Sequence, residues 1–339
     1  MRRAFIITNY IIATILVCSC AKNVKTGAND DNKRFLDAWM EVNHPGINAS
    51  GLGIFILEDE EGTGAEVTDN GYAIVEYTST DLDGNISAYT SAEVAKQIGT
   101  YDSTYFYGPT VWLTKDETIQ AGLQDALVGV KVGTRRKVVI PSWLMTYSSY
   151  ATAEEYLSKS SDYSNTIYDF TVTDFVLDIN DWEINNMKEY MAVNYGGYDT
   201  FVNDTTGFYY KRLELPETDK AFGTDTTIYI NYTGKLLNGL VFDTTDEDTA
   251  KNHGLYSAGK DYAPVSIKWG EKHSDITMGT SASSVVPGFS LTLWHMKPGE
   301  KGVGIFYSPL GYGYSGSGSS IPGYSPLVFE IEIVDKPEE

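Results

Sequence analysis

Cysteine is nearly absent from this 339-residue sequence, which contains two cysteines, at positions 18 and 20. Because no cysteine follows Cys20, an exported form of the chain has no pair with which to make a disulfide in its folded part. Basic residues are also scarce, with 25 Lys and Arg against 46 Asp and Glu, a formal net charge of −21. This charge argues against nucleic acid or anionic lipid head groups as partners, and it favours solubility over an acidic binding face.

The N-terminal apolar run, residues 4–17, is too short to cross a bilayer, which takes about 20 apolar residues. The run follows Arg2 and Arg3 and precedes Cys18-Ser19-Cys20, an order typical of a secretory signal peptide. Its end resembles the bacterial lipobox, which predicts a signal peptide at residues 1–19 and lipid attachment at Cys20. An ordinary cleaved signal peptide with an unmodified Cys20 is the alternative.

This N-terminus predicts a location in the cell envelope. We expect a lipid anchor on Cys20, at the outer membrane facing the periplasm or the surface, followed by a flexible polar tether at residues 20–33.

Metal-ligand patterns are missing as well. The four histidines lack the spacing of a metal site, and residues 81–85 lack the full ligand set of a calcium loop. We therefore expect no metal and no cofactor.

The two halves of the sequence resemble each other, and this internal repeat organises the chain. A segment that begins Gly122-Leu123 aligns without a gap with one that begins Gly288-Phe289. Upstream, residues 75–78 align with residues 230–233, and a helix-like segment precedes each copy, at residues 34–43 and 182–194. The sequence therefore predicts two homologous modules, each a short helix followed by a β-rich domain.

Local patterns in the second module indicate an α+β fold. Residues 327–333 alternate with a period of two, which is typical of a strand with one buried face. Asn238-Gly239 indicates a hairpin, while Phe289, Leu293 and Met296 recur at helical spacing before Pro298-Gly299. We expect a short helix lying across a curved antiparallel sheet.

Residues 225–335 resemble the FKBP family of peptidyl-prolyl cis/trans isomerases. The resemblance rests on the order and intervals of these motifs: Tyr232-Thr233-Gly234, Phe242-Asp243, Val285-Val286-Pro287-Gly288-Phe289, Lys297-Pro298-Gly299-Glu300-Lys301, Tyr312-Gly313, Ile321-Pro322 and Leu327-Val328-Phe329. It implies two FKBP-like domains, at residues 34–180 and 225–339, joined by a helical linker and lead-in strand at residues 181–224.

The chemistry of this family explains the residue types. Rotation about a peptide bond must break amide resonance, a barrier of about 18–20 kcal/mol, so X-Pro bonds exchange over tens to hundreds of seconds. An apolar pocket disfavours the charge-separated planar amide, and a few fixed donors hold the neighbouring carbonyls. No nucleophile, metal or cofactor is needed.

The resemblance implies roles for individual residues of the second module. Tyr312 would donate its hydroxyl to a substrate carbonyl, the Val286 backbone amide would hold a second carbonyl, and Asp243 would lie at the rim. Ile321 would close the flap. The walls and floor of the proline pocket would be Tyr232, Phe242, Val285, Val286, Phe289 and Phe329.

The sequence departs from the family pattern at several positions. Phe289 replaces the usual tryptophan of the floor, and Val265 replaces another aromatic residue of the pocket. Residues 244–263 and 271–284 are longer than usual, and we expect the first of these extensions to lack the basic residue that often pairs with the aspartate.

The first module has lost more of the pattern than the second. It keeps Tyr77 but has no Phe-Asp pair in residues 85–88, and it has Gln120 before the floor helix and Thr146 at the flap position, with Tyr147 one place late as a possible substitute. We expect this copy to be a packing or peptide-docking domain without isomerase activity.

These observations favour an isomerase that assists the folding of exported proteins, with activity in the second module and proline-containing or unfolded polypeptides as partners. The alternative is a peptide-binding chaperone or interaction lipoprotein that uses the same grooves without turnover. A surface protein that recruits a host or glycan ligand has no motif behind it.

Overall fold

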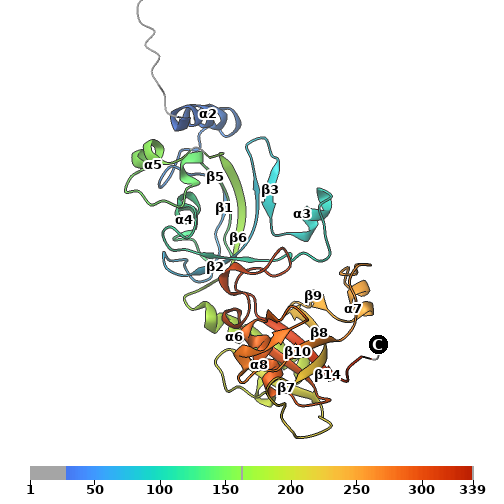
Figure 1. Ribbon diagram of the computed structural model, residues 1–339. Coiled ribbons are helices and arrows are strands. Elements are labelled where there is room, and N and C mark those ends of the chain that lie inside the picture. The colour runs from blue at the N-terminus through green and yellow to red at the C-terminus, as the bar shows by residue number, and fades with distance from the viewer. Residues whose placement is uncertain (1–27, 162, 338–339) are drawn as a thin grey trace, which may run out of the picture.

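The computed structural model describes residues 28–161 and 163–337, which form two β-rich domains placed one after the other (Figure 1). The first domain runs from helix α2 (Ala28–Asn43) to strand β6 (Thr166–Val176), and the second begins with helix α6 (Ile179–Tyr195). The predicted signal peptide, the lipidation site Cys20 and the first part of the predicted tether lie outside the described residues. Within the described residues, no helix combines the length and apolarity that a membrane span requires.

The sheet of the first domain is antiparallel throughout, in the order β1-β5-β6-β2-β3, with β4 paired to β2. Helix α4 lies against this sheet and buries Leu123 and Leu127. The elements not yet delimited are β1 (Phe55–Glu60), β2 (Tyr72–Thr80), β3 (Ile86–Tyr89), β4 (Thr110–Leu113), β5 (Arg135–Ile140), α3 (Ala92–Gln97), α4 (Ala121–Leu127), η1 (Ser142–Leu144) and α5 (Ala153–Lys159).

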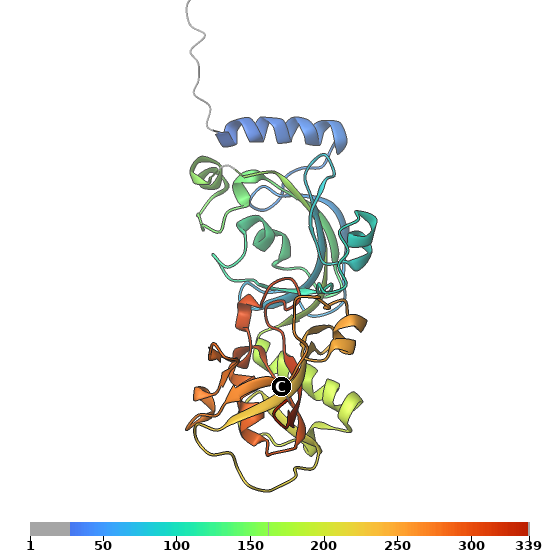
Figure 2. The same cartoon turned by 45° about the vertical axis from the view of Figure 1, so that its right-hand side comes forward.

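Helix α2 lies across the outer end of the first domain (Figure 2). It begins at Ala28, so residues 28–33, which we expected in the tether, are helical instead. Three features explain the early start. Asp30 and Asp31 stand in the first turn, where the helix dipole favours negative charge. Asn29 Nδ2 donates to the Ser160 carbonyl at 2.8 Å, and Leu36 is buried in the core of the domain.

The second sheet has the order β12-β11-β10-β8-β14-β13-β7, with β9 paired to β8, and is likewise antiparallel. Helix α8 (Pro287–His295) lies against it and buries Phe289 and Leu293, so the predicted floor helix and the α+β class are confirmed. The remaining elements are β7 (Phe208–Glu214), β8 (Thr227–Leu236), β9 (Val241–Thr244), β10 (Val265–Lys268), β11 (Thr277–Met278), β12 (Ser283–Ser284), β13 (Lys301–Phe306), β14 (Leu327–Val334), α7 (Glu247–Asn252), η2 (Tyr198–Thr200), η3 (His273–Asp275), η4 (Ser308–Leu310) and η5 (Gly313–Ser315).

Helix α6 covers the face of the second sheet opposite to α8. Its Met187 and Met191 are fully buried in a cluster that includes Val328 of β14. This packing explains why Val328 is buried although it alternates with Leu327 and Phe329, which face the α8 side. The carboxylate of Glu183 fixes the helix further, because its two oxygens accept from the Ser308 backbone N–H and hydroxyl, each at 2.6 Å.

The predicted repeat is present in three dimensions and extends further than the sequence comparison indicated. Thr90 Oγ1 accepts from the Tyr77 N–H, and Thr245 Oγ1 accepts from the Tyr232 N–H, both at 2.9 Å. A short helix follows each threonine, α3 in the first domain and α7 in the second, on the same side of the molecule (Figure 1).

The same repeat includes residues 244–263, the segment of the second module that is longer than usual for the family. We call residues 89–108 the first insertion and residues 244–263 the second insertion. Each carries a stacked pair of tyrosines with a lysine over one ring: Lys96, Tyr101 and Tyr107 in the first, and Lys251, Tyr256 and Tyr262 in the second. Both domains therefore have the same enlarged loop.

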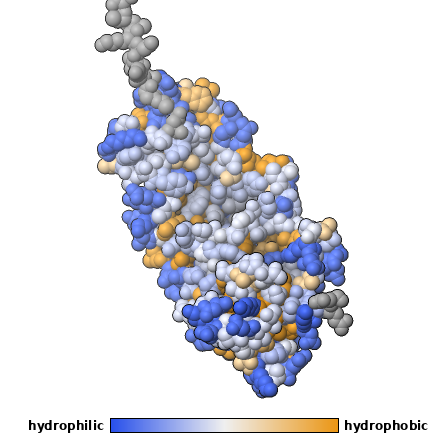
Figure 3. All heavy atoms as spheres, viewed as in Figure 1, coloured by the Kyte–Doolittle hydropathy of each residue, from blue (hydrophilic) through white to orange (hydrophobic). Residues whose placement is uncertain are grey.

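The surface is largely hydrophilic on the face shown in Figure 3, with smaller hydrophobic patches between the charged side chains. Acidic side chains exceed basic ones in the sequence as a whole.

Candidate functional site

The nine side chains predicted to form the proline site surround one pocket of about 420 Å³ in the second domain. They come from five parts of the fold: strands β8, β9 and β14, the start of α8, and the loops after β13. The nine are Tyr232, Phe242, Asp243, Val285, Val286, Phe289, Tyr312, Ile321 and Phe329. Their individual roles stay predictions, but the structure brings all of them together.

The floor of this pocket is a set of aromatic rings in edge-to-face contact. Phe329 is central: its ring centroid lies 5.0 Å from that of Phe289 and 5.6 Å from that of Phe242, with T-shaped geometry in both cases. Tyr232 adds a T-shaped contact with Phe289 at 5.6 Å. Phe289 and Phe329 are almost fully buried, so this surface is preformed and apolar.

Two glycines permit this close packing. A Cβ at Gly234 would lie 2.6 Å from the Phe242 ring and 2.8 Å from the Phe329 ring, and a Cβ at Gly288 would lie 2.2 Å from Phe306. The first glycine belongs to the Tyr-Thr-Gly motif, and the second lets the first turn of α8 approach β13. Glycine is therefore needed at both positions, because a larger side chain would clash with the neighbouring aromatic rings.

The rim of the pocket carries an ordered group of charges. The Tyr232 hydroxyl donates to Asp243 Oδ2 at 2.5 Å, and Lys260 Nζ lies 2.8 Å from Asp243 Oδ1. Lys260 Nζ also donates to the Thr244 carbonyl at 3.1 Å. The expectation that the second insertion offers no basic partner for the aspartate was wrong, because the insertion folds back and delivers Lys260 to it.

The two pocket tyrosines both have raised pKa values. Burial raises the pKa of Tyr232, and the negative charge of Asp243 raises it further. Burial also raises the pKa of Tyr312, with a smaller contribution from Asp243. Both phenols therefore stay protonated near neutral pH and can act as hydrogen-bond donors.

The backbone at the start of α8 supplies a further donor. Val286 is the N-cap residue of this helix, so its carbonyl accepts from Phe289 and Ser290 while its own N–H precedes the helical hydrogen bonds. No acceptor for the Val286 N–H is found among the described residues. The group is thus available for a substrate carbonyl.

Sequence reasoning missed several residues that line or order this site. Met278 from β11 lines the pocket, and so do Ser284, Ser317 and Ser320. Met278 and Ser284 belong to the second extension, residues 271–284, just as Lys260 belongs to the first. Both extensions therefore contribute directly to the site, whereas the sequence indicated only that they were long.

The corresponding region of the first domain is filled by a tryptophan. The Trp112 ring centroid lies 5.1 Å from Tyr77, 6.2 Å from Tyr168 and 6.1 Å from Phe170. Tyr77 corresponds to Tyr232 in the repeat, and Tyr168 pairs with β2 as Phe329 pairs with β8. The aromatic side chains that would receive a proline ring are therefore packed against Trp112.

Thr146 and Tyr147 lie near this cluster. Thr146 is buried and its carbonyl accepts from the Ala121 N–H of α4 at 2.9 Å. Tyr147 is exposed, and its phenol interacts electrostatically with Tyr77 and Tyr168. Burial raises the pKa of Tyr168 to about 12. Tyr147 is thus close to the position of a flap tyrosine, but the rings that it approaches, Tyr77 and Tyr168, already pack against Trp112.

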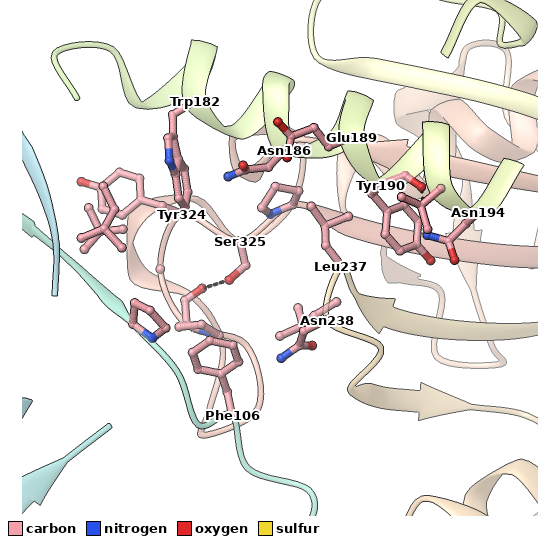
Figure 4. A pocket seen from close by; sticks show the side chains of 18 residues that line it. Phe106, Trp182, Asn186, Glu189, Tyr190, Asn194, Leu237, Asn238, Tyr324 and Ser325 are labelled. Atoms are coloured by element: carbon pink, nitrogen blue, oxygen red, sulfur yellow. Dashed lines mark hydrogen bonds between the residues drawn. The ribbon is translucent and has the colours of Figure 1, made fainter. Parts of the chain in front are cut away.

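A second concavity, the interdomain groove, has a volume of about 560 Å³ and is mostly apolar (Figure 4). Helix α6 contributes Trp182 and Tyr190, the first domain contributes Phe106 and Val111, and the loop before β14 contributes Tyr324. The groove contains none of the nine predicted residues. Within the described part of the chain, no cluster of three His, Cys, Asp or Glu side chains could hold a metal ion.

Comparison with known proteins supports the assignment of the second domain. The sequence model of the FKBP-type peptidyl-prolyl cis-trans isomerase family matches residues 219–334. A probable FKBP-type peptidyl-prolyl cis-trans isomerase of Haemophilus influenzae is 32% identical over 130 residues, which are 38% of this chain and 43% of that protein. Peptidyl-prolyl cis-trans isomerase FKBP9 of Rattus norvegicus is 27% identical over 238 residues, covering 69% of this chain and 32% of that protein.

Among solved structures, FkpA from Escherichia coli matches with a TM-score of 0.32 and 24% identity, over 46% of this chain and 58% of that chain. The chain spans about a third to a half of the length of the curated relatives that it matches. The similarity to FKBP-type peptidyl-prolyl cis-trans isomerases is therefore established for residues 219–334, within the second domain.

Proposed function

We propose that the chain catalyses cis/trans isomerisation of X-Pro bonds in exported polypeptides, and that its second domain carries the activity. The observation that carries the proposal is the pocket of about 420 Å³ around which all nine predicted residues meet. The match of residues 219–334 to the model of the FKBP-type family supports the same activity.

The pocket provides what rotation of an X-Pro bond requires. The aromatic floor made by Phe289, Phe329 and Tyr232 accepts the proline ring and excludes water from the adjoining amide. A planar amide is charge-separated, so an apolar surrounding disfavours it relative to the twisted transition state. In this proposal, the protonated hydroxyl of Tyr312 and the backbone N–H of Val286, two residues that line the pocket, hold the flanking carbonyls while the bond turns.

The ordered rim keeps this arrangement rigid. Tyr232 is held by Asp243, and Asp243 is held by Lys260, so the polar edge next to the twisting bond has one fixed geometry. Preorganised dipoles need little rearrangement during the reaction.

The first domain has a supporting role in this proposal. Its aromatic cluster is filled by Trp112, and Ala88 stands at the repeat position of Asp243, so both the space and the rim charge of a second site are missing. The export signal and a lipid anchor at Cys20 complete the proposal, which places the isomerase in the cell envelope.

A protease-coupled assay on a tetrapeptide with a central X-Pro bond tests the activity of the purified chain. The wild-type chain is expected to accelerate cis-to-trans exchange, and Tyr312→Phe together with Asp243→Ala is expected to lower kcat/KM by about tenfold or more. A wild-type rate equal to that of buffer alone would refute the proposal.

Two matched variants locate the activity. Tyr198→Phe removes a half-exposed phenol outside the pocket and is expected to leave kcat/KM unchanged. Tyr147→Phe removes the candidate phenol of the first domain and is also expected to be silent. If Tyr147→Phe lowered the rate as much as Tyr312→Phe, the assignment to the second domain would be wrong.

A second function, peptide binding without turnover, is favoured by the apolar interdomain groove of about 560 Å³. Its test uses a permanently unfolded polypeptide without proline, titrated by fluorescence anisotropy. Val193→Asp places a charge on the exposed wall of the groove and should weaken binding by at least about fivefold if the groove binds clients. Equal affinities for wild type and variant would remove this second function.

A further inference from the structure

The flap of the second domain, residues 313–324, is in contact with the first domain. The Phe106 N–H of the first insertion donates to the Ser319 carbonyl at 2.9 Å. Ser319 lies at the tip of a turn closed by hydrogen bonds between the backbones of Ser317 and Ile321, at 2.7 and 3.2 Å. Ser317 and Ile321 both line the proline pocket. The acceptor of a hydrogen bond from the first domain, Ser319, therefore lies in the sequence between two residues that line the pocket.

Side chains strengthen this contact. The Phe106 ring packs against the hydrophobic core of the second domain, the cluster that contains Ile321. Figure 4 shows Phe106 extending from its first-domain segment beside the loop that carries Ser325. At the other end of the flap, the Tyr72 ring of β2 meets the Tyr324 ring at 5.6 Å with T-shaped geometry. The first domain thus holds the flap at both its tip and its end.

The flap has little internal support of its own. Gly313, Gly316 and Gly318 have positive φ angles, and most flap side chains before Ile321 are exposed. Tyr324 also has a positive φ, 59°, a conformation that costs free energy for any residue except glycine. Such a segment keeps one position only when surrounding contacts hold it.

The contact between Phe106 and the flap has no counterpart in the other copy of the repeat. The two insertions are alike in their helices and stacked tyrosines, and they touch one another, since a Cβ at Gly254 would lie 2.6 Å from Ser103 Oγ. Yet the repeat position of Phe106 is Asp261, a charged residue. The apolar residue occurs only in the copy that faces the proline pocket.

We propose that Phe106 is a positioning residue of the isomerase site: the first domain holds the flap over the proline pocket and thereby sets the affinity for peptide. The inference rests on the proposed isomerase function. It assigns the first domain, which lacks a proline pocket of its own, a direct part in the site of its neighbour.

The experiment compares the wild-type chain with Phe106→Ala, Phe106→Leu and Tyr105→Ala, a matched control because Tyr105 is an exposed neighbour in the same loop. Phe106→Ala is expected to raise KM about threefold to tenfold with kcat changed less than about twofold, since it loosens binding and not the chemistry. Phe106→Leu, which keeps an apolar contact, should restore most of the affinity, and Tyr105→Ala should behave as wild type.

Hydrogen exchange provides a readout that does not depend on activity. The amides of Ile321 and Tyr324 donate within the flap, to Ser317 and Gly313, and should exchange about tenfold faster in Phe106→Ala while core strands stay protected. Unchanged exchange together with unchanged KM would overturn the inference. If the wild-type chain proved inactive, the proposed function would fail, and exchange alone would then decide whether Phe106 holds the flap.

Discussion

Lys260 and Asp243 form an ion pair at the rim of the proline pocket, with Nζ 2.8 Å from Oδ1, although 16 residues of an inserted loop separate them in the sequence. The pair fixes the carboxylate that accepts the Tyr232 hydroxyl. The second insertion is therefore part of the site, because its Lys260 contacts Asp243 at the rim.

Removal of Lys260 should affect the reaction more than the stability. The two side chains are 45% and 42% exposed, so their attraction is screened, and Lys260→Met should change the free energy of unfolding by less than about 1 kcal/mol. We expect kcat/KM to fall about twofold to fivefold, because Asp243 loses its fixed partner. Stopped-flow isomerase kinetics at low and high salt provide the measurement.

Lys251→Met is the control for this prediction. Lys251 belongs to the same insertion and forms a similarly exposed pair with Glu247, away from the pocket. Equal losses of kcat/KM in the two variants would show that the insertion as a whole matters and not the pair with Asp243.

Alkaline pH should destabilise the second domain through Tyr232. The folded-state pKa of Tyr232 is raised above the ordinary value of 10.0, so the folded state favours the neutral phenol. This contribution to stability is fully present below pH 10 and decreases as the pH rises above it, by up to about 1.4 kcal/mol per pH unit. Urea midpoints should be flat from about pH 7 to 9 and fall towards pH 11.

The same titration with Tyr232→Phe should show a shallower decline. Tyr195 and Tyr210 also have raised pKa values because they are buried, so some decline will persist in the variant. Identical slopes for variant and wild type above pH 10 would contradict the assignment to Tyr232.

Glu183 should be essential for docking helix α6 on the second domain. Its carboxylate is fully buried and accepts two hydrogen bonds from Ser308. Glu183→Ala leaves the Ser308 donors buried without acceptors, and we expect a loss of about 2–3 kcal/mol in the free energy of unfolding of the second domain. Glu189→Ala, on the exposed side of the same helix, should change it by less than about 0.5 kcal/mol in urea denaturation.

Removal of Trp112 should destabilise the first domain without creating an enzyme. The ring contacts Tyr77, Tyr168 and Phe170, so Trp112→Ala should cost about 2–4 kcal/mol, somewhat less than a fully buried tryptophan would. In a background that carries Tyr312→Phe and Asp243→Ala, which lower the activity of the second domain, the variant should show no regained isomerase activity. Measurable turnover there would show that the first domain retains a latent site behind Trp112.

Most residues that surround the pocket of the second domain could be located from the sequence, because they lie on regular elements with ordered motifs. Tyr232, Phe289 and Phe329 occupy β8, α8 and β14, whose alternation and helical spacing are visible without a structure. The hairpin at Asn238-Gly239 was likewise predictable, and Gly239 has the positive φ of 91° that this turn requires.

Residues delivered by loops could not be placed from the sequence. The contacts of Lys260, Met278 and Phe106 with the site depend on how an extended loop folds or on how the two domains pack. A periodic sequence pattern carries no information on either. The repeated insertion itself was detectable. Continuing the ungapped alignment from Tyr77 and Tyr232 pairs Lys96 with Lys251 and Tyr101 with Tyr256.

The stacked tyrosines of the two insertions also indicate how the two domains evolved. Because both copies carry the same helix, lysine and tyrosine pair, the simplest order of events is that a single ancestral domain acquired the insertion before it was duplicated. Divergence followed at the positions of Asp243 and Lys260, where the first copy has Ala88 and Tyr105. The second copy has the ion pair between Asp243 and Lys260 at the rim of its pocket, whereas the first copy contacts the flap of the second domain through Phe106, the residue next to Tyr105.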